Sequence, residues 1–233
     1  MADVYDTVYA VGRQKDYAAE STALVELIHK HHPDAASLLD VACGTGEHLR
    51  HLYGQFSHVA GLELAEPMRA RAQAKLPGVT VHAGDMRDFT LGRTFDVVVC
   101  LFSAIGYAAS TAELRAACQA MARHTAPGGL LIIDPWYHPG GWEGGHLDHT
   151  VAVTGERTVL RLAHSARDGR TSRVTYHYLV GDTGGVTYFT DRHDMTLFTA
   201  AEYTGAIRAA GCARVEFIDG WAAGRARILA VRD

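Results

Sequence analysis

Leu38-Leu-Asp-Val-Ala-Cys-Gly-Thr-Gly-Glu-His-Leu49 is the stretch of this sequence that decides the fold. It opens with an apolar run broken by a single acid, Asp40, which is typical of a strand buried on both faces. Gly44 and Gly46 then allow the backbone to turn sharply and to approach a ligand closely. A helical pattern follows. The order strand, glycine turn and helix predicts the first half of a nucleotide-binding βαβ unit.

The acids around this turn indicate which nucleotide ligand is bound. The next expected strand, residues 59–64, carries Glu63 17 residues after Gly46, close to the spacing at which a carboxylate accepts hydrogen bonds from a ribose. Leu49 replaces the third glycine of the dinucleotide fingerprint, and Asp40 suits a cation better than a pyrophosphate. A ligand with an adenosine, a cationic amino group and no phosphate fits both facts, and S-adenosylmethionine is such a ligand. The alternative is a structural turn in another α/β protein.

Strand and helix patterns alternate along the first half of the chain and return near its end. Helical patterns cover residues 17–32, 67–75, 111–122 and 200–210, and strand patterns cover residues 37–42, 59–64, 79–82, 95–101, 130–134, 215–218 and 228–231. Alternating βα units with short links predict a doubly wound, Rossmann-like α/β sheet of seven strands with an antiparallel closing pair. Pro127-Gly128-Gly129 is expected to form the turn before the fifth strand.

The periodicity changes after the fifth strand. Residues 135–150 are rich in proline, glycine and aromatic residues, as functional loops often are. Within residues 158–197, three stretches alternate like strands between turn signals, residues 158–164, 173–180 and 186–195. They predict an antiparallel meander inserted into the sheet. The expected domains are therefore a Rossmann-like domain of residues 1–137 and 198–233 and an inserted β lobe of residues 138–197.

Asp40-Val-Ala-Cys-Gly-Thr-Gly46 resembles motif I of the class I methyltransferases, which use S-adenosylmethionine. This resemblance implies that Asp85 holds the adenine amino group and that Met86 packs on the ring. Tyrosines of the N-terminal segment are expected either to cover the cofactor or to act as core or surface anchors. The predicted cofactor-binding residues are Tyr5, Tyr17, Asp40, Ala42, Gly44, Gly46, Glu63, Leu64, Asp85, Met86 and Leu101.

Further runs extend the resemblance over nearly the whole chain. They are residues 15–20, 37–46, 61–64, 84–89, 102–107, 135–136, 164–165 and 196–199. With these runs the chain resembles the bacterial dTDP-aminosugar N,N-dimethyltransferases, which make desosamine- and mycaminose-type sugars for antibiotics. The resemblance implies two successive methyl transfers from S-adenosylmethionine to the amine of a nucleotide sugar. Residues 136–140 and 220–226 depart from the family pattern, which leaves room for a different aminosugar.

The family precedent also implies that the inserted sheet supports a homodimer. Tyr176, Tyr178 and Tyr188 are expected to be exposed on this sheet beside a sheet edge, and edges in soluble proteins are normally covered or paired. We therefore expect a homodimer formed through the inserted sheet.

Tyr107 is the predicted catalytic residue, because the resemblance places it where some family members carry a histidine. Methyl transfer requires the sulfur, the methyl group and a neutral amine nitrogen to be aligned. A tyrosine with an ordinary pKa of about 10 is a poor base. Tyr107 is therefore expected to orient the amine, with deprotonation before or during binding. The alternative is that Tyr107 only packs beside the cofactor.

A nucleotide sugar carries two phosphate charges that need donors, and guanidinium groups bind phosphate oxygens well. Arg225 matches the family arginine that contacts the diphosphate, and small residues surround it in a turn. Arg161 and Arg167 are further candidates, with an alternative interpretation as solvated charges on a strand face. Trp136 and Tyr137 follow the fifth strand, where their rings could pack on a sugar or thymine, although Trp136 could instead seal the core. The predicted substrate-binding residues are Ser103, Trp136, Tyr137, Arg161, Arg167 and Arg225.

Composition and charge bound the remaining possibilities. The 233-residue chain has a net charge of −4 and no Lys/Arg run, which does not favour a nucleic-acid partner. No apolar run approaches the roughly 18 residues that a membrane span needs. The four cysteines lack a CxxC spacing, so we expect reduced thiols in a cytoplasmic protein. The 14 histidines form no ligand cluster in the sequence, and no metal is expected.

Two other function classes stay open. A methyltransferase that acts on an oxygen or nitrogen of a non-sugar acceptor would share every cofactor residue with a sugar methyltransferase. A non-enzymatic S-adenosylmethionine-binding module is disfavoured by the complete set Asp40, Gly44, Gly46, Glu63 and Asp85.

Overall fold

A seven-stranded sheet forms the centre of the computed structural model, which describes residues 2–220 and 225–233. The strand order is β10-β11-β5-β4-β1-β2-β3. The strand β11 runs antiparallel to both of its neighbours, β5 and β10, so β10 points in the same direction as the other strands. The bounds are β1 Ser37–Val41, β2 His58–Glu63, β3 Thr80–Ala83, β4 Phe95–Cys100, β5 Thr125–Ile133, β10 Arg214–Asp219 and β11 Ala226–Val231. The predicted Rossmann-like α/β fold is confirmed. The small residues predicted to flank Arg225, Ala222 to Gly224, lie outside the described residues.

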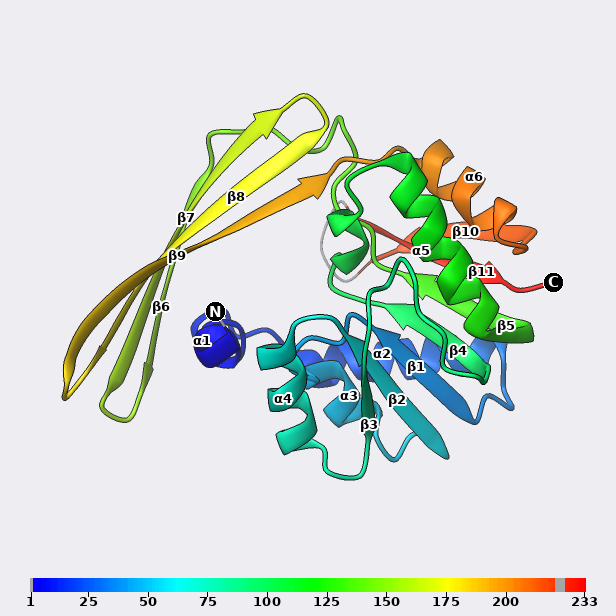
Figure 1. Ribbon diagram of the computed structural model, residues 1–233, viewed down its shortest axis with the longest axis horizontal. Helices are drawn as coiled ribbons and strands as arrows, with labels where there is room; N and C mark the ends of the chain where they lie inside the picture. Colours follow the sequence, from blue (N-terminus) through cyan, green and yellow to red (C-terminus); the bar gives the residue numbers. More distant parts are fainter. Residues whose placement is uncertain (1, 221–224) are drawn as a thin grey trace.

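Helices cover both faces of this sheet (Figure 1). Neighbouring strand residues point to opposite faces, so Leu38 joins one hydrophobic cluster and Leu39 the other. The cluster around Leu38 holds α2, α3 and α4 against the sheet, and the cluster around Leu39 holds α5 and α6. The helix bounds are α2 Tyr17–His31, α3 Glu47–Leu52, α4 Glu66–Lys75, α5 Thr111–His124 and α6 Ala200–Ala209. These bounds agree with the predicted helices to within two residues, apart from α3, for which only a start was predicted.

The predicted turn before the fifth strand is wrong. Pro127, Gly128 and Gly129 lie inside β5, because Thr125 already pairs with Phe95 of β4. The pairing then shifts register before Leu130 pairs with Val97, which marks a bulge. The left-handed φ of 75° at Gly128 explains why the sequence looks like a turn at this point.

The inserted sheet has four antiparallel strands in the order β6-β7-β8-β9, where only three were predicted. Their bounds are β6 Leu147–Thr154, β7 Arg157–Asp168, β8 Thr171–Asp182 and β9 Gly185–Thr196. The strand β6 was missed because the start of it belongs to a stretch rich in proline, glycine and aromatic residues. The expected exposure of Tyr176 and Tyr178 is wrong: Tyr178 is fully buried and Tyr176 half-buried, because both face the interior. Of the three tyrosines, only Tyr188 is exposed, because its side chain points to the outer face of the sheet.

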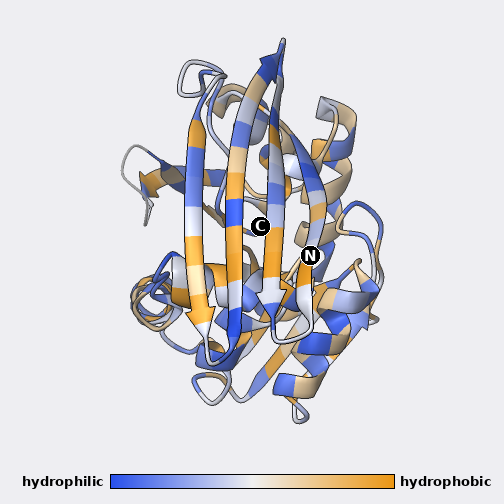
Figure 2. Ribbon diagram, turned by 90° about the vertical axis from the view of Figure 1, so that its left-hand side faces the viewer, coloured by the Kyte–Doolittle hydropathy of each residue, from blue (hydrophilic) through white to orange (hydrophobic). Residues whose placement is uncertain are grey.

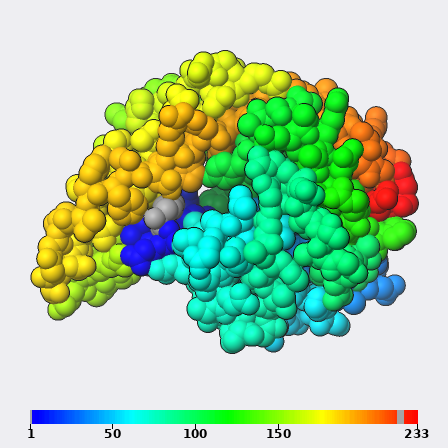
Figure 3. Space-filling model, in the orientation of Figure 1, coloured from blue at the N-terminus to red at the C-terminus, as the bar shows by residue number. Residues whose placement is uncertain are grey.

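The N-terminal segment folds into two short helices that lie between the two sheets. Figure 3 shows this segment (blue) in the hollow between the inserted sheet (yellow) and the parallel sheet (cyan). These helices are α1 Ala2–Asp6 and the π-helix η1 Thr7–Gly12. Asp3 forms ion pairs with Arg71 of α4 and with Arg157 of β7, so it ties the segment to both sides. Val4 and Val8 pack against β7 and β8.

None of the helices in the described part of the chain is long and apolar enough to cross a membrane.

Candidate active site

A cavity of about 600 Å³ lies where the carboxyl ends of β1, β2, β4 and β5 meet the inserted sheet and the N-terminal segment. This volume is in the usual range for a small-molecule site, and strand carboxyl ends are where such sites form. The predicted site residues that line it are Tyr5, Tyr17, Asp40, Ala42, Gly44, Glu63, Leu101, Ser103, Tyr107, Trp136, Tyr137, Arg161 and Arg225. Gly46, Leu64, Asp85, Met86 and Arg167 do not line it.

The turn after β1 has an unusual backbone that opens space for a ligand. Ala42, Gly44 and Gly46 all have left-handed φ values, of 60°, 59° and 78°. A Cβ added at Gly44 would meet no other atom within 4 Å, so the space beside this backbone is open. A Cβ at Gly46 would lie 3.1 Å from the Cβ of Ala72 on α4. Gly46 therefore serves the turn and the packing of α3 on α4, which explains its place outside the cavity.

Asp40, the last acid of β1, is buried with an unmatched carboxylate oxygen. It is 2% exposed, and its Oδ1 atom has no hydrogen-bond partner among the described residues. Burial raises the pKa of Asp40 well above its ordinary value, and the nearby Glu63 and Asp134 add to the effect. A buried carboxylate in this state lacks a positive group. The cationic amino group of S-adenosylmethionine is such a group.

Glu63 is held ready to accept further hydrogen bonds. Its Oε2 accepts a hydrogen bond from the Gly44 N–H at 2.9 Å, and its Oε1 accepts one from the Ala65 N–H at 2.8 Å. Each carboxylate oxygen can accept more than one hydrogen bond, so lone pairs stay available to the cavity. A ribose diol supplies two donors at the matching separation for a carboxylate. Asp40 and Glu63 together therefore fit the predicted cofactor.

Replacing Glu63 by alanine should weaken S-adenosylmethionine binding by about tenfold or more, because a hydrogen bond to a charged group contributes roughly 1.5–3 kcal/mol. The measurement is calorimetric titration of the purified variant with the cofactor. Glu66→Ala, which removes an exposed acid in the first turn of α4, is the matched control. Equal cofactor affinity in Glu63→Ala and the control would mean that the ribose is held elsewhere.

The residues predicted to bind adenine are placed outside the cavity. The carboxylate of Asp85 accepts hydrogen bonds from the Arg87 side chain at 2.5–3.1 Å, and these bonds lower the pKa of Asp85. Arg87 also pairs with Glu113 of α5. Met86 packs against the hydrophobic cluster around Leu39. The assignment of Asp85 and Met86 to adenine stays a prediction, which would require Asp85 to exchange Arg87 for the ligand. Leu64, which was predicted only to bind the cofactor, is 62% exposed.

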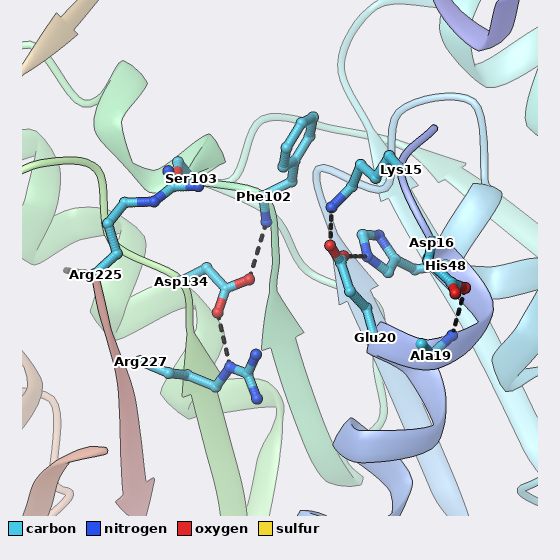
Figure 4. A network of polar contacts seen from close by, with 10 residues as sticks. All are labelled: Lys15, Asp16, Ala19, Glu20, His48, Phe102, Ser103, Asp134, Arg225 and Arg227. Carbon is cyan, nitrogen blue, oxygen red and sulfur yellow. Dashed lines mark hydrogen bonds and ion pairs between the residues drawn. The ribbon is translucent and has the colours of Figure 1, made fainter. Parts of the chain in front are cut away.

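The other half of the cavity contains Arg225 among aromatic rings. Its guanidinium donates a hydrogen bond to Ser103 Oγ at 3.0 Å and lies 5.2 Å from the ring centre of Tyr137 and 5.9 Å from that of Trp136. Ser103 in turn donates to the carbonyl of Pro135 at 3.1 Å. Arg225 thus points to the carboxyl ends of β4 and β5, as predicted (Figure 4).

A second set of polar contacts surrounds Phe102, next to Ser103 (Figure 4). Asp134 at the end of β5 accepts hydrogen bonds from the Arg227 side chain at 2.8 Å and from the Phe102 N–H at 3.3 Å. Phe102 and Ser103 have left-handed φ values of 52° and 67°. Such a backbone is costly for residues other than glycine, and Asp134 helps to hold it in place.

Lys15 is a positive group of the site that the sequence did not single out. Its ammonium lies 4.3 Å from the ring centre of Phe102 and pairs with Glu20, which also contacts His48 (Figure 4). Burial lowers the pKa of Lys15, although the pairing with Glu20 opposes the shift. A smaller cavity of about 210 Å³ is lined by Arg13, Lys15 and Arg225 and shares several walls with the large one.

The two arginines of the inserted sheet have different places. Arg161 is 2% exposed, donates to Asp148 and Thr150 at 3.2 Å, and lies over the rings of Tyr9 and Tyr176. Its alternative interpretation as a solvated charge is therefore wrong.

Arg167 is exposed, and the structure does not bring it to the cavity. It donates hydrogen bonds to the carbonyls of Pro139, Trp142 and Gly169, so it fixes the loop before β6.

Aromatic residues beyond the predicted ones complete the walls. The ring of Tyr5 packs at a tilt of 46° on that of Tyr9, whose ring meets Phe102 edge-on at 5.2 Å. Trp142 packs on both Trp136 and Tyr137. The aromatic loop 135–150 was a signal for Trp142. Tyr9 is one of the N-terminal tyrosines that were expected to cover the cofactor or to act as anchors. The β9 residue His193, which is hydrogen bonded to Tyr107, had no sequence signal of its own.

No group of three or more His, Cys, Asp or Glu side chains within residues 2–220 and 225–233 is arranged to hold a metal ion.

A doubly wound sheet with the two acids Asp40 and Glu63 beside a glycine turn at its carboxyl edge is the arrangement expected of a class I methyltransferase. The comparisons agree. The family model for a methyltransferase domain matches residues 38–129. The crystal structure of Streptomyces venezuelae DesVI superposes with a TM-score of 0.94 at 47% identity and covers 100% of this chain and 98% of that one.

Two further relatives indicate which kind of methyltransferase this is. The chain is 47% identical over 231 residues to the dTDP-3-amino-3,4,6-trideoxy-α-D-glucopyranose N,N-dimethyltransferase of Streptomyces venezuelae, covering 99% of this chain and 97% of that protein. It is 44% identical, with a TM-score of 0.90, to the S-adenosylmethionine-bound structure of an amino pentose methyltransferase from Micromonospora echinaspora, covering 99% and 97% of the two chains. The chain belongs to the family of dTDP-aminosugar N,N-dimethyltransferases and is an S-adenosylmethionine-dependent enzyme.

Proposed function

We propose that this enzyme transfers two methyl groups in succession from S-adenosylmethionine to the amino group of a dTDP-linked sugar in the biosynthesis of an antibiotic. The observation that carries the proposal is the composition of one continuous cavity. Asp40 and Glu63 match the cofactor, whereas Arg225 and the neighbouring aromatic rings match a negatively charged nucleotide. One cavity therefore contains complementary groups for the cofactor and for the nucleotide sugar.

The positive groups beside Phe102 suit the diphosphate. Arg13, Lys15 and Arg225 line the smaller cavity, together with the carboxylates of Glu20 and Asp134, which pair with Lys15 and with Arg227. The chain as a whole is acidic, so local positive groups are needed to attract a dianion. Arg225 offers several N–H donors in a planar fork that matches phosphate oxygens. Trp136 and Tyr137 offer flat apolar faces for thymine or the sugar ring.

The chemistry asks the protein mainly for alignment. The bound cofactor supplies an electrophilic methyl group, and the sugar nitrogen must attack it in line with the departing sulfur. Correct positioning of two reactants can contribute about 7–11 kcal/mol to lowering a barrier. The N-terminal segment and the inserted sheet form the walls that shield the cavity. The Thr45 hydroxyl of the turn after β1 donates a hydrogen bond to Asp6 at 2.6 Å, which holds the N-terminal segment over this turn.

The test is an assay with S-adenosylmethionine and a panel of dTDP-aminosugars, with mass spectrometry of the products over time. The panel should contain 3-amino and 4-amino sugars, because relatives at 47% and 43% identity are named for one and the other. We expect a monomethylated intermediate that is converted to a dimethylated product. If no member of the panel is methylated, a methyltransferase with a non-sugar acceptor becomes the better interpretation.

We also infer a homodimer formed through the outer face of the inserted sheet. Strand pairing places Val151, Leu160, Leu179 and Tyr188 side by side in one row across all four strands. Val151 is 50%, Leu179 43% and Tyr188 58% exposed. Figure 2 views these strands face on, with hydrophobic positions in orange. A continuous apolar row on a broad sheet favours burial against a second copy. The lobe of residues 138–197 would thus serve both substrate and assembly.

Leu179→Asp should convert this dimer to a monomer, because it places a charge in the centre of the apolar row. Light scattering at micromolar concentration measures the mass. Phe217→Asp makes the same change at a residue 41% exposed on β10 and should leave the mass unchanged. A monomeric wild type, or a Leu179→Asp protein with wild-type mass, would contradict this interface.

We place the enzyme in the cytoplasm as part of this proposal. Its four cysteines are free thiols, and Cys100, Cys118 and Cys212 are buried. Free thiols persist in a reducing compartment.

A further inference from the structure

A chain of three hydrogen-bonded side chains joins the two sheets at the cavity. The Tyr107 hydroxyl is hydrogen bonded to His193 Nδ1, and His193 Nε2 lies 3.1 Å from Asp191 Oδ2. Tyr107 ends the 3-10 helix η2 (Ala104–Tyr107), which follows β4, whereas His193 and Asp191 are two residues apart on β9. Tyr107 and His193 both line the cavity. The three side chains therefore connect the cavity to Asp191, which does not itself line the cavity.

Asp191 fixes the direction of the protons along this chain. The hydrogen bond from His193 lowers the pKa of Asp191, so its carboxylate is ionised and can only accept. His193 must then carry its proton on Nε2 and donate it to Asp191, which leaves Nδ1 as an acceptor. Tyr107 consequently donates its O–H to Nδ1. The free lone pair of the Tyr107 oxygen is thus available to accept from a group in the cavity.

We propose that Tyr107, His193 and Asp191 form a proton relay that deprotonates the sugar ammonium before each methyl transfer; this inference rests on the proposed function. The ammonium N–H bond breaks and its proton joins the Tyr107 oxygen. The Tyr107 O–H bond breaks at the same time, and that proton joins His193 Nδ1. The products are a neutral amine with a free lone pair and an imidazolium paired with the Asp191 carboxylate. Tyr107 is the catalytic residue, and His193 and Asp191 act through it.

Tyr107 alone is a poor base for the sugar ammonium, and the relay overcomes this. Burial raises the pKa of Tyr107, so a phenolate is costly at this position. Passing the proton on keeps the phenol neutral and places the positive charge next to a carboxylate. A second methyl transfer requires a second deprotonation, because the product of the first is a secondary ammonium. The His193 side chain is 21% exposed and can return its proton to solvent between the two transfers.

The groups around His193 set the expected pH dependence. Asp191 lies beside it on β9, Tyr176 of β8 meets its ring edge-on at 5.1 Å, and Tyr107 approaches from η2. Glu63 and Tyr9 act on Tyr107 from farther away. Among these, the Asp191 carboxylate is the charge in direct contact, and it favours the imidazolium. The relay accepts protons only when His193 is neutral, so activity should fall at acid pH.

The test compares Tyr107→Phe, His193→Gln and Asp191→Asn with the wild type on the dTDP-aminosugar that the wild type methylates. For His193→Gln and Tyr107→Phe we expect kcat to fall by about 10²-fold or more at neutral pH, the range for general acid–base catalysis. This deficit should shrink at alkaline pH, where the free amine is neutral in solution. For Asp191→Asn the acidic limb should move to lower pH. Cofactor affinity by calorimetry should not change in any of the three.

The ring signals of His193 in NMR spectra test the relay without any substrate. We expect Asp191→Asn and Tyr107→Phe each to shift these signals, because each substitution removes one hydrogen-bond partner of the ring. His82→Gln, at a histidine on the edge strand β3, should change neither the kinetics nor the His193 signals. A His193→Gln deficit that is constant across pH, or His193 signals that neither substitution moves, would overturn the relay. A wild type that methylates no dTDP-aminosugar would overturn the proposed function instead, and the NMR signals would still decide whether the hydrogen-bond chain exists.

Discussion

Asp40→Asn is expected to weaken S-adenosylmethionine binding by about a hundredfold while it stabilises the ligand-free protein. The wild-type carboxylate is buried, and its Oδ1 atom has no hydrogen-bond partner among the described residues. Pairing it with a cation recovers an interaction of roughly 1.5–3 kcal/mol that an amide cannot provide. In the absence of cofactor, however, a buried charge is a cost, and the amide removes that cost.

The sign of the pH dependence follows from the same burial. Because the pKa of Asp40 is raised in the folded protein, the folded state holds this proton more tightly than the unfolded state. The stability of the ligand-free protein should therefore fall as pH rises from the unfolded value of about 3.9 through the folded pKa. Cofactor affinity should change in the opposite direction, because only the ionised carboxyl binds a cation. Asp40→Asn should lose both dependences.

Asp96 provides the matched control for Asp40. It lies on β4, and its Oδ2 accepts hydrogen bonds from Ala36 N–H and Ser37 N–H at 2.9 Å. Burial alone would raise the pKa of Asp96, but these hydrogen bonds outweigh it and lower the pKa. Asp96→Asn should therefore destabilise the protein above the unfolded pKa and leave cofactor affinity unchanged. Calorimetric titration and thermal unfolding across pH measure both. Wild-type cofactor affinity in Asp40→Asn would show that the cation is held elsewhere.

The sheet and half of the site were predictable because they depend on local sequence. Asp40, the glycine turn and Glu63 lie within one βα unit and the strand that follows it, so strand register alone brings them together. The same holds for Ser103 and Trp136, which follow neighbouring strands. Parallel strands place their carboxyl ends at one edge, and any residue just beyond such an end is a candidate.

The rest depends on contacts that no local pattern encodes. Tyr107 of the 3-10 helix η2 and His193 of β9 are separated by 86 positions, so their contact exists only once the inserted sheet folds over the cavity. Lys15 belongs to a matched run of the family, but its approach to Phe102 requires the N-terminal segment to dock. For Asp85, no local pattern indicates that Arg87, two residues further along the chain, hydrogen bonds to the carboxylate.

Arg225→Ala is expected to reduce the affinity for dTDP by about 10- to 150-fold, which corresponds to roughly 1.5–3 kcal/mol for a hydrogen bond to a charged group. Arg225 already lies at the cavity wall, held by Ser103 and flanked by Trp136 and Tyr137, so little ordering is needed when a ligand arrives. Such preorganisation increases the contribution of each contact to binding. Arg225→Lys should keep part of the affinity, because it keeps the charge but loses the planar fork.

Thymidine separates the diphosphate from the base in this test. It carries no phosphate, so Arg225→Ala should bind thymidine as the wild type does while losing affinity for dTDP. Cofactor affinity should also stay unchanged, because Asp40 and Glu63 lie at the other strand ends. Arg208→Ala, which removes an exposed arginine from α6, controls for the loss of one positive charge from the molecule. If thymidine and dTDP lose affinity equally, Arg225 packs on the base rather than binding phosphate. If neither ligand loses affinity, Arg225 does not bind the diphosphate, and Arg13 and Lys15 of the same cavity become the next candidates.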